Sequence, residues 1–233
     1  MTKQVKSKER VADHGEVFTA EREDKAMCDL VQDMCDQIGK TFLEPACGDG
    51  NFLAEILDRK LARVKKDAKS DKTQWEWLSV RAVASLYGVD ILQDNAEECR
   101  KRLFKQWDTA YKKACKKECN DETRESVKYI LSKNIVCGNA LTMMCVDENQ
   151  QDTEDYIVFS EFTIARPYIL KHCEYRLDVL LKANEKPTEQ RKLITDSDDI
   201  YNYLEINSVT GEYEPKPLRI YNPIHYRRIK ENG

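Results

Sequence analysis

The sequence predicts an α/β protein with a mostly parallel sheet and helices on both faces of that sheet. Short apolar strands at residues 41–44, 86–89 and 134–137 alternate with segments whose apolar residues recur every three or four positions. A glycine-rich turn with the sequence ACGDGN separates the first strand from the helix that follows it. Strands that alternate with helices form parallel sheets, because each helix carries the chain back to the edge where the next strand begins.

The composition is that of one folded domain. Of the 233 residues, 41% are apolar and 34% are charged, which provides enough apolar surface for a core and too much for a disordered chain. The net charge is −4, so a uniformly basic surface for nucleic acid is excluded, and any such partner must meet a local patch. No apolar run approaches 18 residues, and the charged N-terminus lacks the apolar stretch of a secretory signal. We therefore expect neither a membrane span nor export.

The nine cysteines, an odd number, favour buried, reduced thiols in a cytoplasmic protein. Four of them lie in segments of helical or strand pattern, where a small apolar residue would serve equally: Cys28, Cys35, Cys99 and Cys137. The alternative is a zinc site, for which the candidates are Cys115, Cys119, His172 and Cys173. No second paired cysteine motif accompanies the first pair, so we expect no metal site.

The first half of the chain contains the clearest elements. Apolar residues at helical spacing predict a helix over 27–38, which Gly39 ends. Residues 41–44 form a short strand broken by Pro45, and the apolar residues from 52 to 64 again follow helical spacing. The order is therefore helix, strand, glycine-rich turn and helix.

The middle of the chain repeats this alternation. A helical segment around residues 75–78 leads into the second strand, which ends in Asp90. A long helical stretch over 93–133 then precedes the third strand, which Gly138 and Asn139 close. The C-terminal part is less regular, and there we expect the following elements: an acidic loop over 147–155, a fourth strand over 156–159 and a helix over 175–183.

The ends of the three strands carry groups suited to a nucleoside, and ligands of open α/β sheets bind beyond the carboxyl ends of the strands. The glycines of the first turn let the backbone approach a ligand, and the helix that begins near Asn51 offers unpaired N–H groups. Asp90 is an acceptor for paired ribose hydroxyls, and Asn139 has the donor and acceptor needed to read an adenine edge. A dinucleotide is less suited, because Leu53 stands where the third glycine of G-x-G-x-x-G belongs.

Four segments resemble successive motifs of the N6-adenine DNA methyltransferases, in that family's order: HGEVFTA (14–20), FLEPACGDGNFL (42–53), YGVDI (87–91) and NIVCGNAL (134–141). The resemblance covers roughly residues 10–142. It implies a Rossmann-like, S-adenosylmethionine-dependent methyltransferase fold with S-adenosylmethionine as its cofactor. Carried over by position, Thr19, Glu44 and Ala46 would lie at the methionine end of the cofactor, and Gly48 with Gly50 would shape the turn.

The same resemblance implies the residues at the nucleoside end of the cofactor. Asp90 would bind the ribose hydroxyls, and Ile91 would pack on the adenine. Asn139 and Ala140 would meet the adenine edge. Two positions depart from the family pattern, because Ala20 replaces the usual proline and Asn139 replaces a frequent aspartate.

The catalytic motif of the family is missing. Methylation of adenine N6 requires a flipped base in a pocket, and the family holds it with an (Asp/Asn/Ser)-Pro-Pro-aromatic element after the fourth strand. Here Ser160 would accept a hydrogen bond from N6 and Phe162 would stack on the base, but both prolines are absent. The segment NPIHY at 222–226 has an Asn-Pro start in the wrong place in the order, so a C-terminal turn is the preferred interpretation.

A basic stretch, residues 100–133, is the candidate contact with DNA. It holds 11 Lys or Arg against 5 Asp or Glu, and such side chains neutralise phosphates. Only about 70 residues follow Phe162, fewer than a target-recognition region usually takes. A partner protein would then supply target recognition.

Three functions stay open at this point. The preferred one is an S-adenosylmethionine-binding, methyltransferase-like component of DNA modification, as in restriction-modification systems. The second is a catalytically inactive binding or regulatory protein, and the third is a methyltransferase for RNA, protein or a small molecule. The expected organisation is an N-terminal segment (1–20), a methyltransferase-like cofactor-binding domain (21–165) and an irregular C-terminal extension packed on it (166–233).

Overall fold

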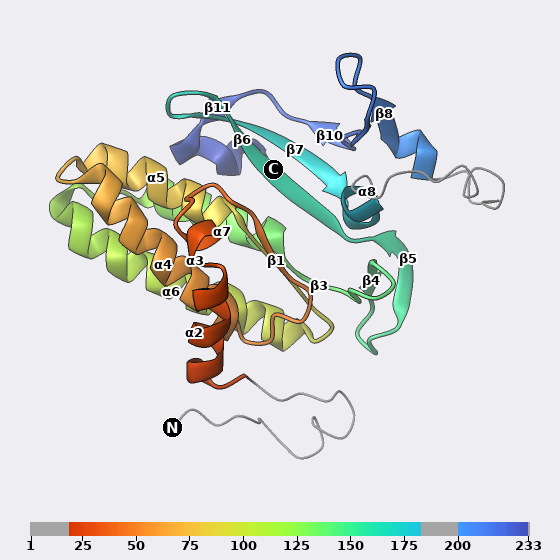
Figure 1. Ribbon diagram of the computed structural model, residues 1–233, viewed down its shortest axis with the longest axis horizontal. Helices are drawn as coiled ribbons and strands as arrows, with labels where there is room; N and C mark the ends of the chain where they lie inside the picture. The colour runs from red at the N-terminus through yellow and green to blue at the C-terminus, as the bar shows by residue number, and fades with distance from the viewer. Residues whose placement is uncertain (1–18, 183–199, 233) are drawn as a thin grey trace.

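A small parallel sheet forms where the sequence places its three short strands. The computed structural model describes residues 19–182 and 200–232. In it, β1 (Phe42–Glu44), β2 (Leu86–Asp90) and β3 (Ile135–Cys137) pair in the order β1-β2-β3, and both pairings are parallel (Figure 1). All three carboxyl ends therefore lie at the same edge of this sheet.

Two helices fill each connection between these strands. The chain passes from β1 through α4 (Asn51–Ala68) and α5 (Lys72–Ala84) to β2, and from β2 through α6 (Gln93–Cys115) and α7 (Asp121–Asn134) to β3. The single helix expected over 93–133 is thus divided by the short helix η1 (Lys116–Glu118). The break has a local cause, because Lys116 has a φ of 54° and the Asn120 side chain caps α7 by accepting a hydrogen bond from the Thr123 N–H at 2.8 Å.

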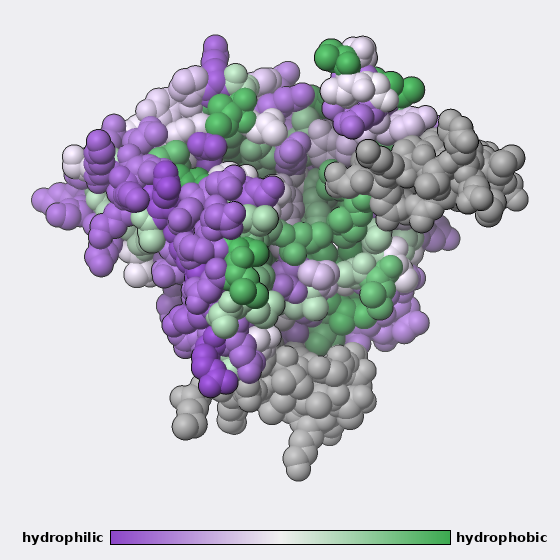
Figure 2. Space-filling model, in the orientation of Figure 1, coloured by the Kyte–Doolittle hydropathy of each residue, from purple (hydrophilic) through white to green (hydrophobic). Residues whose placement is uncertain are grey.

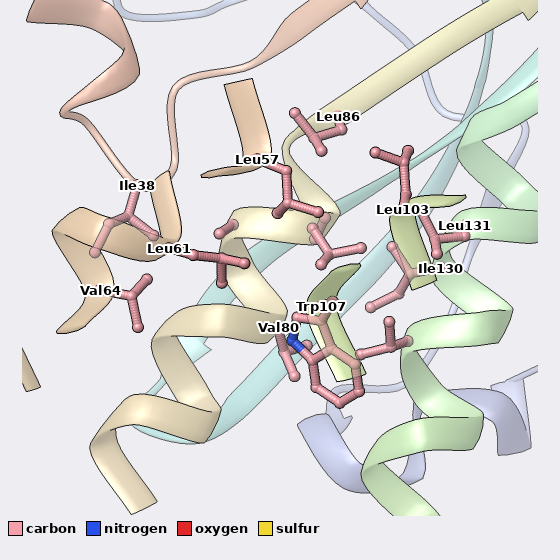
Figure 3. Close-up of a cluster of buried hydrophobic side chains, with 14 of the residues drawn as sticks. Ile38, Leu57, Leu61, Val64, Val80, Leu86, Leu103, Trp107, Ile130 and Leu131 are labelled. Atoms are coloured by element: carbon pink, nitrogen blue, oxygen red, sulfur yellow. The ribbon is translucent and has the colours of Figure 1, made fainter. Parts of the chain in front are cut away.

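The main core joins these four helices to one face of the sheet. Apolar side chains from α4, α5, α6 and α7 meet Leu86 of β2 and Ile135 of β3. Figure 3 shows part of this cluster, including Leu57, Leu61, Val80, Leu86, Leu103, Trp107, Ile130 and Leu131. Trp107 is fully buried, and its indole N–H donates to Ser79 Oγ at 3.0 Å, so the polar atom of this large ring has a partner inside the core.

The predicted Rossmann-like fold, with a mostly parallel sheet and helices on both faces, is wrong. Among the described strands, the parallel pairings are those of the three-stranded central sheet. The second face of this sheet, which Tyr87 and Val89 form, packs against Ile157, Phe159 and Leu177 rather than against a helical layer. The protein is instead mixed α/β, with a small parallel sheet and several small antiparallel ones.

The antiparallel sheets hold the remaining strands. β4 (Met144–Val146) pairs with β5 (Asp152–Tyr156), and β8 (Leu204–Ile206) pairs with β9 (Tyr213–Pro215). The largest of these sheets contains four strands: β6 (Val158–Arg166), β7 (Ile169–Arg176), β10 (Arg219–Ile220) and β11 (Ile224–His225). Its long β6–β7 hairpin crosses the upper part of Figure 1.

A short connection explains why the fourth predicted strand does not join the parallel sheet. The strand expected over 156–159 covers the last residue of β5, Tyr156, and the first two residues of β6. Only Pro167 and Tyr168 separate β6 from β7. A parallel connection needs a crossover of a dozen residues or more, whereas a two-residue turn produces an antiparallel hairpin. Tyr168 has a φ of 64°, which fits such a turn.

The C-terminal segments pack into the main core. The helix expected over 175–183 is shorter, because β7 extends to Arg176 before α8 (Leu177–Lys182) begins. After η3 (Ile200–Tyr203), the chain ends in η4 (Tyr226–Asn232), whose Tyr226 and Ile229 are fully buried against the helices. The predicted boundary between 165 and 166 falls within β6.

The buried carboxylate of Glu76 on α5 joins the C-terminal helix to the helical layer. It accepts hydrogen bonds from the Tyr226 hydroxyl at 2.5 Å and from the Arg227 guanidinium at 2.6 Å, and also from Tyr111. Thr123 Oγ1 donates to the same group at 3.0 Å. Burial alone raises the pKa of Glu76, but the hydrogen bonds from Tyr111, Tyr226 and Arg227 outweigh this effect and hold the pKa below its usual value.

The N-terminal helix begins earlier than its pattern predicts and is broken. α2 (Glu21–Leu30) and α3 (Gln32–Cys35) replace the single helix expected over 27–38, and their buried residues are Asp24, Cys28 and Cys35. Residues 14–18 of the HGEVFTA segment lie outside the described residues. The face in Figure 2 carries hydrophilic side chains over the helices and a band of hydrophobic ones across the middle. Among the described helices, none is both long and apolar enough to cross a membrane.

Candidate functional site

A cavity of about 580 Å³ lies at the carboxyl edge of the parallel sheet. Its volume is in the range of small-molecule sites, roughly 300–1,000 Å³. Eight of the nine residues predicted to bind the cofactor line it: Thr19, Glu44, Ala46, Gly48, Asp90, Ile91, Asn139 and Ala140. The ninth, Gly50, is buried beneath the glycine-rich turn. Strand ends that are far apart in the sequence are therefore brought together around one space.

The glycine-rich turn owes its shape to two glycines in the left-handed region. Gly48 has a φ of 52° and Gly50 a φ of 89°, and Gly50 is the residue at which α4 begins. A Cβ atom on Gly50 would lie 2.7 Å from Cys99 Sγ, so α6 also leaves no room for a side chain there. The Cys47 N–H donates to the Val89 carbonyl at 2.9 Å, which holds the turn against the end of β2.

The Asp90 carboxylate organises this end of the sheet. Its Oδ2 accepts a hydrogen bond from the Gly48 N–H at 2.8 Å, and its Oδ1 accepts from the Leu92 N–H at 2.9 Å and from Asn95 Nδ2 at 3.2 Å. The sequence predicts Asp90 as a partner of ribose hydroxyls, but it does not predict that the same carboxylate ties the turn after β1 to the start of α6. Any ligand contact of Asp90 is therefore made by a carboxylate that protein donors already orient.

The turn after β3 forms the other side of the cavity. The Gly138 N–H donates to the Asp90 carbonyl at 2.9 Å, which places Asn139 at the rim. Asn139 Nδ2 donates to Asp152 Oδ1 at 3.0 Å, and its Oδ1 accepts from the Leu141 N–H at 3.0 Å. The amide of Asn139 is thus held by its own turn and by β5, with one N–H left to point elsewhere.

The charges around the cavity are of one sign. Asp24, Glu44, Asp49 and Asp90 line it, and among the residues that the structure describes no Lys or Arg belongs to the lining. Arg102 of α6 lies beside it but is engaged by Asp49 Oδ2 at 2.5 Å and by Asn51 Oδ1 at 2.6 Å.

Burial and repulsion by neighbouring acids raise the pKa values of two of these groups, Asp24 and Glu44. Burial, with a further contribution from Glu55, raises the pKa of Asp24 to about 6, and burial also raises the pKa of Glu44. A cavity with these charges suits a ligand that carries positive charge and hydroxyl groups. It disfavours a ligand rich in phosphate, because carboxylates repel phosphate and the described part of the lining holds no cation to compensate.

The two residues predicted to hold the target base do not line this cavity. Ser160 is buried on β6, where its hydroxyl lies 2.8 Å from His172 Nε2, and Phe162 stacks on the His172 ring at 4.6 Å between centroids. Phe162 lies beside Gly39 and Thr41, which precede β1, so it is at the opposite edge of the sheet. The reason is the direction of β6, since an antiparallel strand carries its later residues away from the carboxyl edge.

Many cations of the basic stretch 100–133 already form ion pairs within the protein and are therefore less available to DNA than the composition suggests. Six of its cations form ion pairs: Lys101, Arg102, Lys112, Arg124, Lys128 and Lys133. Within the described part of the chain, Lys105 and Lys113 have no ion-pair partner, and they line an open groove of about 780 Å³ between α4 and α6. Lys65 of α4 and Lys69, which directly follows this helix, also line the groove.

The cysteines of the alternative zinc site are distributed over two parts of the fold. Cys115 ends α6 and Cys119 follows it, whereas His172 and Cys173 lie on β7. Cys115 Sγ contacts the Lys72 carbonyl at 3.6 Å, and Cys119 Sγ contacts the Tyr111 carbonyl at 3.5 Å. No group of three or more His, Cys, Asp or Glu is arranged to hold a metal ion in the regions that the structure describes.

No protein-family model, curated protein or solved structure matches this chain. The resemblance to the adenine methyltransferases therefore stays a prediction from four short segments. Sequence reasoning missed one prominent residue of the cavity, Asp24, because an acidic residue in the first turn of a helix is ordinarily read as a favourable partner of the helix dipole. No signal in the sequence distinguishes such a residue from one that faces a cavity.

Proposed function

We propose that this protein binds S-adenosylmethionine in the cavity at the carboxyl edge of the parallel sheet and serves as a cofactor-binding component of DNA modification. The observation that carries the proposal is the convergence of three distant strand ends, with their predicted residues, on one cavity lined by acidic side chains. S-adenosylmethionine fits these charges, because its sulfonium and ammonium outweigh its single carboxylate and leave a net positive charge, and because it carries ribose hydroxyls and no phosphate.

The cofactor half of the predicted function has more support than the catalytic half. Ser160 and Phe162 pack against His172 at a distance from the cavity, so they form no base pocket beside a bound cofactor. Methyl transfer to adenine would then use a pocket supplied by a partner protein. The same observation favours a second candidate, a methyltransferase-like protein that binds the cofactor without transferring its methyl group.

Isothermal titration calorimetry with S-adenosylmethionine tests the proposal. Ala46 is exposed at the cavity, so Ala46→Phe obstructs the space without removing a core contact. Ala62 on α4 is also exposed and does not line the cavity, which makes Ala62→Phe the matched control. We expect binding at micromolar concentrations by the wild type and the control, and at least tenfold weaker binding by Ala46→Phe. An absence of binding at tens of micromolar to the wild type would refute the proposal.

Transfer of a labelled methyl group separates the two candidates. The chain alone, given S-adenosylmethionine and adenine-containing duplex DNA, is expected to transfer little or no label, because no base pocket adjoins the cavity. If transfer is observed, Ser160→Ala and Phe162→Ala decide whether β6 takes part. Transfer that both variants abolish would show that the hairpin does contribute to the base pocket.

Contact with DNA is proposed along the groove between α4 and α6, where Lys105 and Lys113 lie without ion-pair partners among the described residues. The double variant Lys105→Ala/Lys113→Ala should weaken binding of a fluorescent duplex and reduce the slope of log K against log[salt] by about 2. The control is Lys40→Ala/Lys216→Ala, which removes the same charge from residues outside the groove. Equal affinities of the two double variants would refute contact along this groove.

A further inference from the structure

Asp24 combines burial with the lack of a hydrogen-bonding partner. Its exposed fraction is 3%, and its backbone N–H bonds to the Ala20 carbonyl at 3.1 Å, as expected near the start of α2. No described residue donates a hydrogen bond to its carboxylate. Buried carboxylates in folded proteins are nearly always paired, since the desolvation of an unpaired charge is strongly unfavourable. Glu76 in the same protein, with donors from five residues, is the ordinary case.

The side chains around Asp24 make its position less favourable still. The charged groups that face it are Glu23 on its own helix, Glu44 at the end of β1, Asp49 in the turn, Glu55 on α4 and Arg102 on α6. Arg102 is the one cation of this set, and Asp49 and Asn51 occupy its guanidinium. Asp49 itself has a buried Oδ1 for which no partner is present among the described residues. At one end of the cavity, the Asp24 carboxylate and the Oδ1 atom of Asp49 thus have no donor among the described residues.

This end of the cavity is distinct from the end where a nucleoside would lie. Asp24 lines the cavity together with Thr19 and Glu44, whereas Asp90 and Asn139 lie at the ends of β2 and β3. A ligand that fills the whole cavity would present two different chemical ends to these two groups of residues. The group next to Asp24 has to be a hydrogen-bond donor, and a cationic one would relieve both the unpaired carboxylate and the repulsion among the acids.

We infer that Asp24 is a binding residue for a primary ammonium group, and that its carboxylate receives the α-ammonium of the amino-acid end of the ligand. This inference rests on the proposed function, because it takes S-adenosylmethionine as the ligand. It adds a residue that none of the four motif segments contains. It also gives a physical reason for an acidic cavity, since selection against phosphate and recognition of an ammonium use the same charges.

Calorimetry with two ligands tests the inference. S-adenosylhomocysteine carries the ammonium, and 5′-methylthioadenosine has the same nucleoside and thioether without the amino-acid end. Asp24→Asn keeps the size of the side chain and removes its charge, so we expect it to weaken binding of S-adenosylhomocysteine at least tenfold and of methylthioadenosine less than twofold. Glu23→Gln is the matched control, because it removes one negative charge from an exposed neighbour on the same helix that does not line the cavity, and it should change the affinity of either ligand less than twofold.

The pH dependence of binding gives a second readout that needs no variant. Asp24 is protonated as the pH falls below about 6, so the wild type should lose affinity for S-adenosylhomocysteine between pH 7 and pH 5 while its affinity for methylthioadenosine stays level. Asp24→Asn should show no such difference between the ligands. Asp24→Asn should also keep or raise the melting temperature of the free protein, since it removes an unpaired buried charge.

The outcomes separate this inference from the function on which it rests. If the wild type binds neither ligand nor S-adenosylmethionine, the proposed function is wrong and the inference with it. If the wild type binds and Asp24→Asn behaves like Glu23→Gln, only the role of Asp24 is refuted. An equal loss of both ligands in Asp24→Asn would also refute it, because the residue would then shape the cavity rather than contact the ammonium.

Discussion

The cavity at the carboxyl edge of the parallel sheet and the contact between α5 and the C-terminal helix each contain a buried acid, but the two acids differ in their hydrogen-bonding partners. On α5, Glu76 receives hydrogen bonds from Tyr226 and Arg227 of the C-terminal region, which lie 150 and 151 residues further along the chain. In the cavity, Asp24 receives none from the described residues. The comparison indicates that the first acid stabilises the fold, whereas the second destabilises the free protein, as expected if Asp24 binds the ammonium group that we propose.

The two regions also differ in the contacts that hold their residues in place. Around the cavity, Gly48, Asp90 and Gly138 hold one another through hydrogen bonds at the strand ends, so each residue acts close to its own strand. In the C-terminal region, the hairpin is held by contacts to distant helices. The variants below test this difference, in order of decreasing expected effect.

The largest effect is expected for Glu76→Leu. It leaves the hydroxyls of Tyr111 and Tyr226 and the Arg227 guanidinium without their acceptor in the core, so we expect a loss of about 4 kcal/mol in the free energy of unfolding, measured with urea. The control Glu122→Leu changes an exposed acid at the start of α7 and should cost less than about 1 kcal/mol. A small effect of Glu76→Leu would show that the C-terminal helix is held by its apolar contacts alone.

The second-largest effect is a loss of folding stability at low pH, which we expect from His172. His172 is fully buried between Phe162 and Tyr221, and burial lowers its pKa to about 4. Its pKa in the unfolded chain is about 6.5, so the unfolded state binds the proton first, and stability falls as the pH is lowered from 6.5 to 4. The loss is on the order of 3 kcal/mol for this residue when the pH reaches 4.

The control for the acid effect is His172→Phe. This variant should lose most of the slope of unfolding free energy against pH over that window. A residual slope of the same sign is expected from His225, whose pKa burial also lowers. An unchanged slope in His172→Phe would assign the acid sensitivity to groups elsewhere in the protein.

A smaller loss is expected for Gly50→Ala at the cavity. The methyl group meets Cys99 Sγ, and the φ of 89° is unfavourable for alanine, so we expect about 2 kcal/mol less stability and loss of ligand binding. Cys99→Ala removes the steric contact but not the backbone strain. The double variant Gly50→Ala/Cys99→Ala should therefore recover part of the stability relative to the sum of the single variants. Strict additivity of the two changes would contradict the close approach of α6 to the turn.

The smallest effect is expected for Tyr87→Phe, which probes the junction of the two regions. The Tyr87 hydroxyl donates to the Ser160 carbonyl at 3.1 Å across the second face of the parallel sheet. Its removal should cost about 1 kcal/mol, measured by urea unfolding, and should leave binding of S-adenosylmethionine unchanged. Weaker ligand binding in Tyr87→Phe would mean that the hairpin and the cavity are coupled.

Much of the parallel sheet could be predicted from the sequence, and the C-terminal half could not. The strands that became β1, β2 and β3 and the helix after the glycine-rich turn follow from local apolar spacing and from the glycines themselves. The strand that begins β6 was also found, but its direction was predicted wrongly. Apolar alternation is the same in a parallel and an antiparallel strand, and it does not show which surface the strand covers.

By itself, the sequence determined the order of the strands through β3 and the strand-end residues that line the cavity, because a residue at a strand end acts within a few positions of its own strand. The tertiary structure alone decided that β6 turns back on itself through Pro167 and Tyr168, that Ser160 and Phe162 face His172, and that Asp24 is buried without a partner. These three results depend on contacts between residues far apart in the chain. Their energies depend on desolvation and packing in the folded state, for which local residue patterns carry no signal.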